Sequence, residues 1–248
     1  MSDEVRVERD GGVAVLILDA QERRNALTVE MARAVVAACD DLDADASVGA
    51  VVVSGAGPYF CAGGDRPTLA AAGDAPADPE VFSGMSAIYR AFTRVGELEA
   101  PTIAAIRGGA VGAGMNLALA TDLRVVAEDA VLASGFVPIG LHPGGGHTAL
   151  LARTGAREAA AALALFGARI DGRRAAELGL AWAAVPAEDV DRVARELAAV
   201  PGADPELARR TARSLRLSAG PPGLPWAAAH DLERAAQMWS MRRSALAR

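Results

Sequence analysis

The chain has 248 residues, of which 52% are apolar and 23% charged, and its formal net charge is −6. This composition is that of an ordinary globular protein, and the length is sufficient for one large core. An acidic chain without runs of Lys and Arg among aromatic residues is not expected to bind nucleic acid. Its two cysteines provide no disulfide framework.

The N-terminus and the longest uncharged stretch both argue against export and membrane insertion. The segment Met1-Ser-Asp-Glu-Val5 carries acids where a signal peptide would carry bases and an apolar run. Residues 130–152 lack formal charge over a length that could span a bilayer, but they include five glycines, two prolines and two histidines. We therefore expect a cytoplasmic protein with no membrane partner.

Taken in chain order, short apolar runs in the first half of the chain alternate with helical patterns. Strands are predicted at residues 13–18, 51–53, 103–106 and 123–127. Helices are predicted after Thr28, through residues 85–92 and over residues 115–120. Thr28 is expected to cap the first of these helices, and the acidic stretch 40–45 to end it. Strands that alternate with helices predict an α/β fold of mainly parallel βα units.

From Glu158 onward one helical pattern follows another, with no strong strand between them. These helices are predicted at residues 158–166, 173–178, 189–199, 205–217 and 226–247. We predict an α/β core over residues 1–190 and a C-terminal helical region over residues 191–248 that serves as an oligomerisation surface. Four arginines recur at helical spacing and are expected to form a solvated helix face rather than a polyanion site: Arg209, Arg210, Arg213 and Arg216.

Two glycine-rich loops follow predicted strands, and both lead toward helices. They are Phe60-Cys-Ala-Gly-Gly-Asp65 and Gly108-Gly-Ala-Val-Gly-Ala-Gly114. Glycine allows backbone amides to approach one ligand atom, and a helix N-terminus adds unpaired donors. Leu117 occupies the third glycine position of a dinucleotide fingerprint, and no Gly-Lys-Ser/Thr follows. The residues alone leave two interpretations open, namely tight turns or an oxyanion hole built from both loops.

Short motifs follow one another along nearly the whole chain. They are Asn25-Ala-Leu27, Gly55-Ala-Gly57, Phe60 to Asp65, Gly112-Ala-Gly114, Leu117-Ala118 with Asp122, Pro143-Gly-Gly-Gly146, and Ala175-x-x-Leu-Gly-Leu180 with Val185-Pro186. Each is weak alone, but in this order they resemble the enoyl-CoA hydratase/isomerase (crotonase) family. The resemblance implies a crotonase-like spiral of ββα units, a homotrimer or hexamer, and an acyl-CoA thioester as ligand. It implies no separate cofactor, since coenzyme A is part of the substrate, and no metal.

The resemblance also assigns residues to the ligand. The backbone N–H groups of Gly64 and Ala113 would be the two oxyanion donors. CoA would lie against four residues near the first loop: Arg24, Ala26, Ala62 and Asp65. The carboxylates of Asp65 and Asp122 are expected to be caps or ion-pair members rather than catalysts. Two such amides would stabilise the enolate-like oxygen formed when water adds to an unsaturated thioester or its double bond moves.

Three positions where the family carries catalytic acids have other residues here. The resemblance places them at Asn116, at Phe136, which would line the substrate site, and at Gly144. Phenylalanine cannot transfer a proton, whereas an asparagine amide can hold a water molecule. The nearest titratable substitutes are His142 and His147, which flank the Pro-Gly motif. Further candidates, if they face the pocket, are Glu80, Glu97 and Glu99.

Two hypotheses of different classes follow. The first is an enzyme of the hydratase/isomerase type that uses a displaced acid–base group such as His142. The second is a protein that binds acyl-CoA on the same scaffold without chemistry. A dehalogenase or thioester hydrolase would need a carboxylate nucleophile, which the sequence does not place. The intact glycine loops favour the enzyme.

Overall fold

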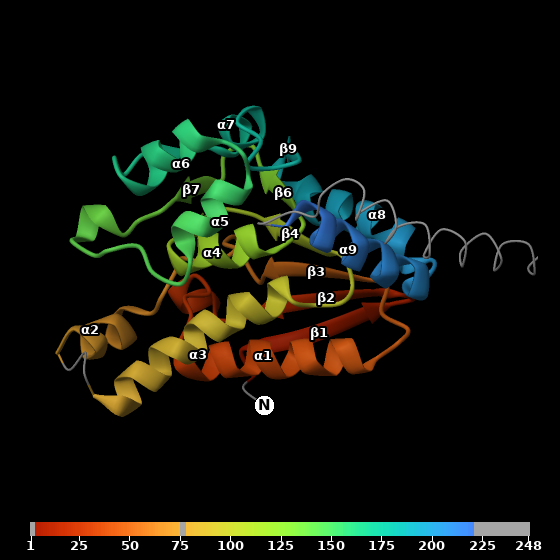
Figure 1. Cartoon of the computed structure of the whole chain (residues 1–248), viewed down its shortest axis with the longest axis horizontal. Helices are drawn as coiled ribbons and strands as arrows, with labels where there is room; N and C mark the ends of the chain where they lie inside the picture. Colours follow the sequence, from red (N-terminus) through yellow and green to blue (C-terminus); the bar gives the residue numbers. More distant parts are fainter. Residues whose placement is uncertain (1–2, 75–77, 221–248) are drawn as a thin grey trace, which may run out of the picture.

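A six-stranded mixed sheet forms the centre of the fold in the computed structural model, which describes residues 3–74 and 78–220 (Figure 1). Its strand order is β1-β2-β3-β4-β6-β9; β1 is antiparallel to β2, and every other neighbouring pair is parallel. The strands are β1 (Val5–Asp10), β2 (Val13–Leu18), β3 (Ala50–Gly55), β4 (Thr102–Ile106), β6 (Leu123–Ala127) and β9 (Ala183–Val185). The predicted α/β class with mainly parallel pairing is confirmed.

Helices cover the large sheet. Strands β2, β3 and β4 are buried along their whole length, as expected for parallel strands that are covered on both faces. Helix α8 (Val190–Gly202) packs across β2, β3, β4 and β6. Helices α1 (Val29–Ala44) and α3 (Pro79–Gly96) pack side by side, with α1 against β1 (Figure 1). The remaining long helix, α9 (Pro205–Ala219), packs on α8.

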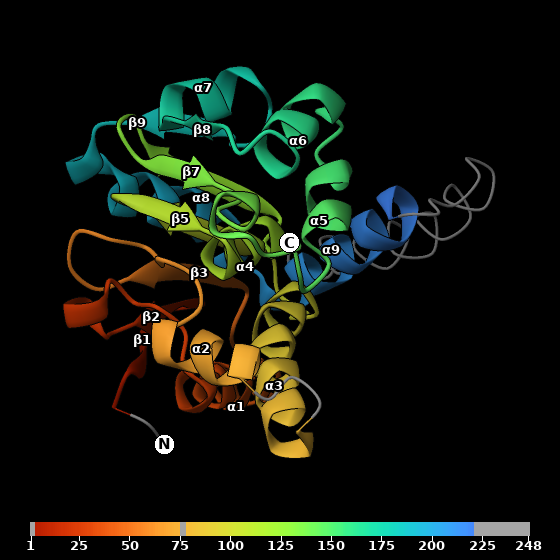
Figure 2. The same ribbon diagram turned by 90° about the vertical axis from the view of Figure 1, so that its left-hand side faces the viewer.

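A second, smaller sheet lies beside the large one (Figure 2). It consists of β5 (Gly109–Val111), β7 (Val131–Ala133) and β8 (Arg169–Ile170), with β5 parallel and β8 antiparallel to β7. The shorter helices are α2 (Arg66–Asp74), α4 (Ala113–Ala120), α5 (His147–Arg153), α6 (Arg157–Ala164) and α7 (Gly172–Glu177). Single 3-10 turns are η1 (Gln21–Arg23), η2 (Val137–Ile139) and η3 (Ala187–Asp189). Within residues 3–74 and 78–220, no helix combines the length and apolarity needed to cross a bilayer.

The predicted elements are found with two corrections. Helix α1 ends at Ala44 with Asp45 as its C-cap, within the acidic stretch 40–45 that was expected to end it. Strand β1 was not predicted, since charged side chains interrupt its apolar pattern. The short strands β8 and β9 break the all-helical pattern expected after residue 158, and at two and three residues they are too short to show a period. As predicted, the Thr28 hydroxyl caps α1, accepting from the Met31 amide at 3.1 Å.

The predicted C-terminal region begins one residue into α8. This helix packs directly on the large sheet, so the two predicted parts are in contact. The predicted helix at residues 226–247 lies outside the described residues. The assembly function assigned to residues 191–248 stays a prediction.

The expectation of a solvated arginine face on α9 is wrong for two of its members. The Arg209 guanidinium donates to the carbonyl oxygens that end α1 and follow it, those of Leu42, Asp43, Asp45 and Val48, at 2.7–3.2 Å. Arg216 binds the Asp122 carboxylate at 2.6 Å and the Ala100 carbonyl oxygen at 3.1 Å. Helix α9 therefore supplies cations to carbonyl oxygens left unpaired by other elements.

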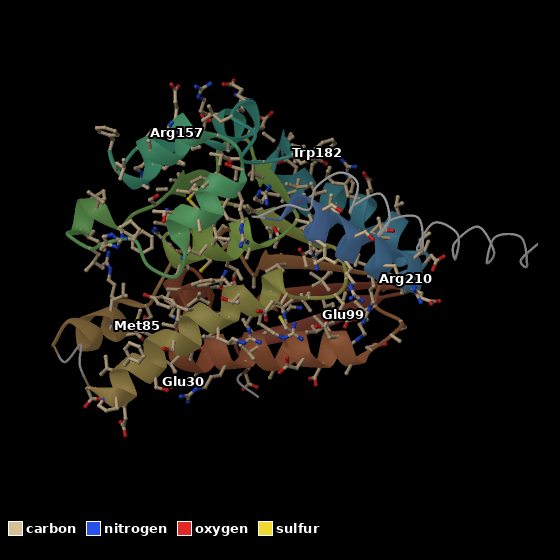
Figure 3. All side chains as sticks on the ribbon, in the orientation of Figure 1. Glu30, Met85, Glu99, Arg157, Trp182 and Arg210 are labelled. Atoms are coloured by element: carbon tan, nitrogen blue, oxygen red, sulfur yellow. The ribbon has the colours of Figure 1, made fainter. Side chains whose placement is uncertain are left out.

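Replacing Arg209 by alanine is expected to lower the free energy of unfolding by about 2–3 kcal/mol, because several partly buried carbonyl oxygens lose a charged donor. The matched control on the same helix is Arg210→Ala. Arg210 is exposed and pairs with Glu206 one turn away, and such pairs contribute less than about 0.5 kcal/mol. Urea unfolding followed by circular dichroism measures both variants. Figure 3 labels Arg210 and Glu99, the ion-pair partner of Arg209. Equal losses of unfolding free energy in the two variants would contradict the stabilising function of Arg209.

Candidate functional site

The Asn25 side chain bonds three backbone groups from two segments. It is fully buried; its Oδ1 accepts from the Ala20 amide at 2.8 Å, and its Nδ2 donates to the carbonyl oxygens of Ala56 and Tyr59 at 3.0 and 2.7 Å. Arg24 and Asn25 both have φ 55°, a left-handed conformation that asparagine adopts more readily than most residues. This arrangement, called the Asn25 clamp below, fixes the turn after β2 against the loop after β3.

The clamp places the first glycine loop alongside the segment after β2. Leu27 N–H donates to the Gly63 carbonyl oxygen at 2.8 Å, and Asp65 N–H donates to that of Leu27 at 2.9 Å. On its other side the loop pairs with β5, since Val111 N–H donates to the Cys61 carbonyl oxygen at 3.1 Å. Three segments that are distant in sequence therefore run in parallel as an extension of the small sheet.

Glycines allow the two predicted loops to touch through their backbones. A Cβ on Gly114 would collide with the Cys61 carbonyl oxygen, and one on Gly63 would lie 2.9 Å from that of Val111. A Cβ on Gly63 would also lie 3.8 Å from the Ala113 nitrogen, so the two loops meet close to the start of α4. A side chain at either glycine would separate them.

The backbone amides of Gly64 and Ala113 have no hydrogen-bond acceptor among the described residues. Gly64 sits in a parallel bridge with Leu27, in which the neighbouring residues make the hydrogen bonds. Ala113 is the first residue of α4, where a helix has no internal acceptor for its N–H, and Gly112 before it provides no side-chain cap. Neither amide donates a hydrogen bond to any group within residues 3–74 and 78–220. Two unpaired donors thus come from the two adjacent loops.

The residues expected to hold CoA lie around the first loop. Ala62 N–H donates to the Arg24 carbonyl oxygen at 3.0 Å, and the exposed Arg24 guanidinium lies 5.5 Å from the centre of the Tyr59 ring. Ala26 is buried and Ala62 partly exposed. The structure therefore brings Arg24, Ala26 and Ala62 together, and their binding function stays a prediction.

Two carboxylates make structural contacts. Asp65 precedes α2 and accepts from the Thr68 amide and hydroxyl at 3.3 and 3.2 Å, as an N-cap does. Asp122 accepts from the Thr102 amide and hydroxyl and pairs with Arg216. Burial alone would raise the pKa of Asp122, but these partners hold it below its usual value. Both fit the expected structural function.

The three positions of the expected acids lie near one another. Asn116, on the first turns of α4, donates from Nδ2 to the Gly144 carbonyl oxygen at 3.0 Å. Phe136 packs edge-on against the His147 ring, with 5.1 Å between ring centres. A Cβ on Gly144 would lie 2.5 Å from the Tyr89 hydroxyl, so Tyr89 occupies the space that an acidic side chain there would need. The site thus has an amide, a phenyl ring and a tyrosine where the resemblance places carboxylates.

Behind these positions lies a buried polar chain. His147 Nδ1 is 2.6 Å from Asn116 Oδ1, and His147 Nε2 is 2.5 Å from Ser134 Oγ. All three residues are about 1% exposed. Burial lowers the pKa of His147 to about 4, so its imidazole is neutral at pH 7.

The other titratable candidates lie elsewhere. His142 is exposed, and its Nδ1 is 2.7 Å from the Pro143 carbonyl oxygen. Glu97 pairs with Arg90, and Glu99 with Arg209 near α9 (Figure 3). Glu80 is exposed at the start of α3. Burial raises the pKa of the Cys61 thiol to about 12, which keeps it protonated and unreactive.

Sequence reasoning missed Ser134 and treated His147 only as one of two histidines beside a turn. A serine that directly follows a three-residue strand has no distinguishing pattern, and its partner is 13 residues away. Among the described residues no group of three or more His, Cys, Asp or Glu could hold a metal ion.

Comparison with known proteins covers the same elements. The family model described as Enoyl-CoA hydratase/isomerase matches residues 8–215. A Mycobacterium tuberculosis protein named "Probable enoyl-CoA hydratase EchA14" is 41% identical over 223 residues, which are 90% of this chain and 85% of that protein. The residues matched by the family model, 8–215, include part of β1, the other strands of the large sheet, both glycine loops and the buried polar chain.

Solved structures agree in fold. The crystal structure of an enoyl-CoA hydratase from Polaromonas sp. JS666 aligns with a TM-score of 0.86 and 29% identity, covering 97% of this chain and 92% of that one. A Thermobifida fusca YX protein solved in complex with CoA aligns with a TM-score of 0.82 and 28% identity, covering 98% and 94%. The resemblance read from the motifs is confirmed, together with the fold that it implies.

The buried imidazole predicts how stability depends on pH. The unfolded chain takes up a proton at His147 as the pH falls through 6.5, whereas the folded chain does so only near 4. The free energy of unfolding is therefore expected to lose up to about 3 kcal/mol between pH 6.5 and 4 through this residue. In His147→Gln this loss is absent, so the stability difference between wild type and variant shrinks as the pH falls.

Urea unfolding at half-unit pH steps measures the effect. The control is His142→Gln, which removes an exposed histidine from the same loop and is expected to leave the slope of the wild type unchanged. A His147→Gln variant that loses stability as steeply as the wild type across this range would contradict the prediction.

Proposed function

The chain belongs to the enoyl-CoA hydratase/isomerase family, and from this premise we propose that it binds an acyl-CoA thioester and stabilises its enolate in a backbone oxyanion hole. The single observation that carries the proposal is that the amides of Gly64 and Ala113, on two loops in direct contact, have no acceptor among the described residues. A thioester oxygen held by both amides would accept two hydrogen bonds at once. The relative solved in complex with CoA supports the ligand class.

The proposed chemistry follows from where charge develops. Removing a proton from the α-carbon of a thioester, or adding a nucleophile to the β-carbon of an unsaturated one, places negative charge on the carbonyl oxygen. Amides that are already oriented stabilise this charge without reorganisation. The positive end of the α4 dipole, at Ala113, acts in the same direction. The site therefore favours the enolate over the ground-state carbonyl.

We infer that CoA lies along the first loop. Arg24 provides an exposed cation for its phosphates, and its guanidinium is held near the Tyr59 ring. The left-handed backbone at Arg24 and Asn25 turns this segment toward the loop. Coenzyme A enters as part of the substrate, and the proposal needs no further cofactor.

Exposed apolar side chains support the proposed assembly into a homotrimer or hexamer. Among the described residues Phe166 is 83% exposed and Trp182 68%, and exposed residues of this size are typical of protein–protein contacts. Figure 3 shows Trp182 on the upper side of the molecule, near β9. Residues 191–248 remain the proposed contributor to the interface.

The second candidate function, acyl-CoA binding without chemistry, is favoured by Asn116, Phe136 and Gly144. None of these residues titrates near neutral pH, and the family's acids are expected at these positions. Turnover distinguishes the two candidates. A protein that binds crotonyl-CoA in calorimetry but converts no 2-enoyl or 3-enoyl thioester at high enzyme concentration would be the binder.

Replacing Ala113 by proline is expected to lower turnover of enoyl thioesters by about 10²–10³-fold, because it removes one of the two proposed donors. Ala113 is the first residue of α4, where proline is tolerated and its missing N–H breaks no helical bond. The matched control is Ala113→Gly, which keeps the amide. Steady-state kinetics with crotonyl-CoA and a 3-enoyl thioester, with folding checked by circular dichroism, provide the measurement. Full activity in the proline variant would remove Ala113 from the oxyanion hole.

A further inference from the structure

The buried polar chain behind the glycine loops has a defined direction. Asn116 Nδ2 donates to the Gly144 carbonyl oxygen at 3.0 Å, which turns Asn116 Oδ1 toward His147. The opposite amide orientation would place two acceptors against each other at Gly144, so it is excluded. His147 Nδ1 therefore carries the hydrogen, Nε2 is bare, and the Ser134 hydroxyl donates to Nε2 across 2.5 Å.

This direction makes the Ser134 oxygen the basic end of the chain. Its hydrogen is committed to His147, so its lone pairs are the part of the hydroxyl that can accept a proton from elsewhere. His147 is held by a partner on each ring nitrogen, and Phe136 packs against the ring. A serine, a histidine and an orienting amide in this order form the arrangement that activates hydroxyl groups in other proteins.

The chain ends beside the second glycine loop. Gly112 N–H donates to the Ala133 carbonyl oxygen at 3.1 Å, so Ser134 directly follows a residue bonded to that loop. A Cβ on Gly112 would lie 3.5 Å from the Ser134 carbonyl oxygen and 3.8 Å from the Phe136 ring. Ala113, which supplies one proposed oxyanion donor, is the next residue, and Asn116 lies three residues further along the same helix. The polar chain and the oxyanion amide thus share one structural element.

We propose that Ser134 is the residue that transfers protons to and from the thioester substrate, with His147 as the base behind it and Asn116 as a positioning residue. This proposal rests on the proposed function, since it needs the thioester oxygen between Gly64 and Ala113. It assigns the proton transfer itself to Ser134 and His147, neither of which stands at one of the three positions where the family's acids are expected. Sequence reasoning had favoured His142, which is exposed and bound to its own loop.

The step balances within the site. The Cα–H bond of the substrate breaks, its proton joins Ser134 Oγ, and the hydroxyl proton of Ser134 passes to His147 Nε2. The electron pair moves to the thioester oxygen, which becomes an enolate held by the two amides, and the imidazole becomes an imidazolium. The reverse transfer returns the proton to Cα, or to Cγ of an unsaturated chain, in which case the double bond has moved.

The test separates binding, proton transfer and hydrolysis. Butyryl-CoA is the probe, because it can exchange its α-protons without any further reaction. Calorimetry measures its binding, proton NMR measures exchange of its α-protons in D2O, and a thiol reagent measures release of free CoA. The variants are Ser134→Ala and Asn116→Asp, and Ser47→Ala is the matched control at an exposed serine bound to Asp45.

Ser134→Ala is expected to slow α-proton exchange by at least about 10²-fold, the usual contribution of a positioned proton-transfer group, while butyryl-CoA affinity changes less than about threefold. Ser47→Ala is expected to match the wild type. In the wild type, the rate of α-proton exchange falls at low pH as His147 becomes protonated. Asn116→Asp is expected to move this fall to higher pH, because a carboxylate hydrogen-bonded to His147 Nδ1 stabilises the imidazolium. A merely structural Asn116 would leave this fall at the same pH, so this variant tests the proposal even if Ser134→Ala folds poorly.

The contrary outcomes differ for the two proposals. If the wild type shows no affinity for butyryl-CoA, the proposed function fails. If the wild type binds and exchanges but folded Ser134→Ala exchanges equally fast, the assignment of Ser134 fails and the oxyanion hole stands. Binding without exchange in the wild type overturns the relay and leaves the acyl-CoA binder. Release of CoA that depends on Ser134 identifies a nucleophile that forms an acyl ester, which also overturns proton transfer.

Discussion

The Asn25 clamp is the interaction on which the site depends. One buried amide side chain satisfies an N–H and two carbonyl oxygens from the segments after β2 and β3. Without it, these groups would be buried and unpaired, at a cost of roughly 1–3 kcal/mol each. The clamp also holds Arg24 and Asn25 in left-handed backbone, a conformation of order 1 kcal/mol or more above the usual ones. From this fixed turn the backbone ladder extends through Leu27 and the two glycine loops.

The ladder explains why the proposed site consists of backbone atoms. In a parallel pair of strands, the N–H and C=O of one residue point to the same side of its strand. Leu27 makes its hydrogen bonds to Gly63 and Asp65, so the amide of Gly64 between them points away from Leu27. The same holds at the other loop, where Gly112 is bonded to Ala133 and Ala113 begins a helix. The unbonded amides of Gly64 and Ala113 thus result from the regular backbone hydrogen bonding of their neighbours. Their positions are therefore as rigid as the sheet that extends into them.

These features differ in how far the sequence reveals them. The buried strand β2 was predicted with its observed bounds, because its apolar run is continuous and is bounded by glycine and polar residues. Gly63 and Gly114 were identifiable because a backbone contact excludes every side chain, which leaves glycine as a visible sign. Strand β1 was missed because its solvent-facing edge carries charges. Arg209 was misread because its acceptors are carbonyl oxygens, which no side-chain pattern reports.

The polar chain was beyond the reach of the sequence for a further reason. Ser134, His147 and Asn116 come from β7, α5 and α4 or the residues that flank them, and only the packing of these three elements aligns them.

The departures from the family pattern are nevertheless connected. A carboxylate at 116 would be a buried charge beside the neutral imidazole of His147, and it would need a cationic partner. With an amide at 116 and a phenyl ring at 136, these two contacts of His147 carry no charge, and burial keeps the imidazole neutral. In the proposed mechanism, charge would form only when a proton moves, as an enolate and an imidazolium that stabilise each other, so the uncharged residues at 116 and 136 and the neutral His147 would fit one electrostatic arrangement.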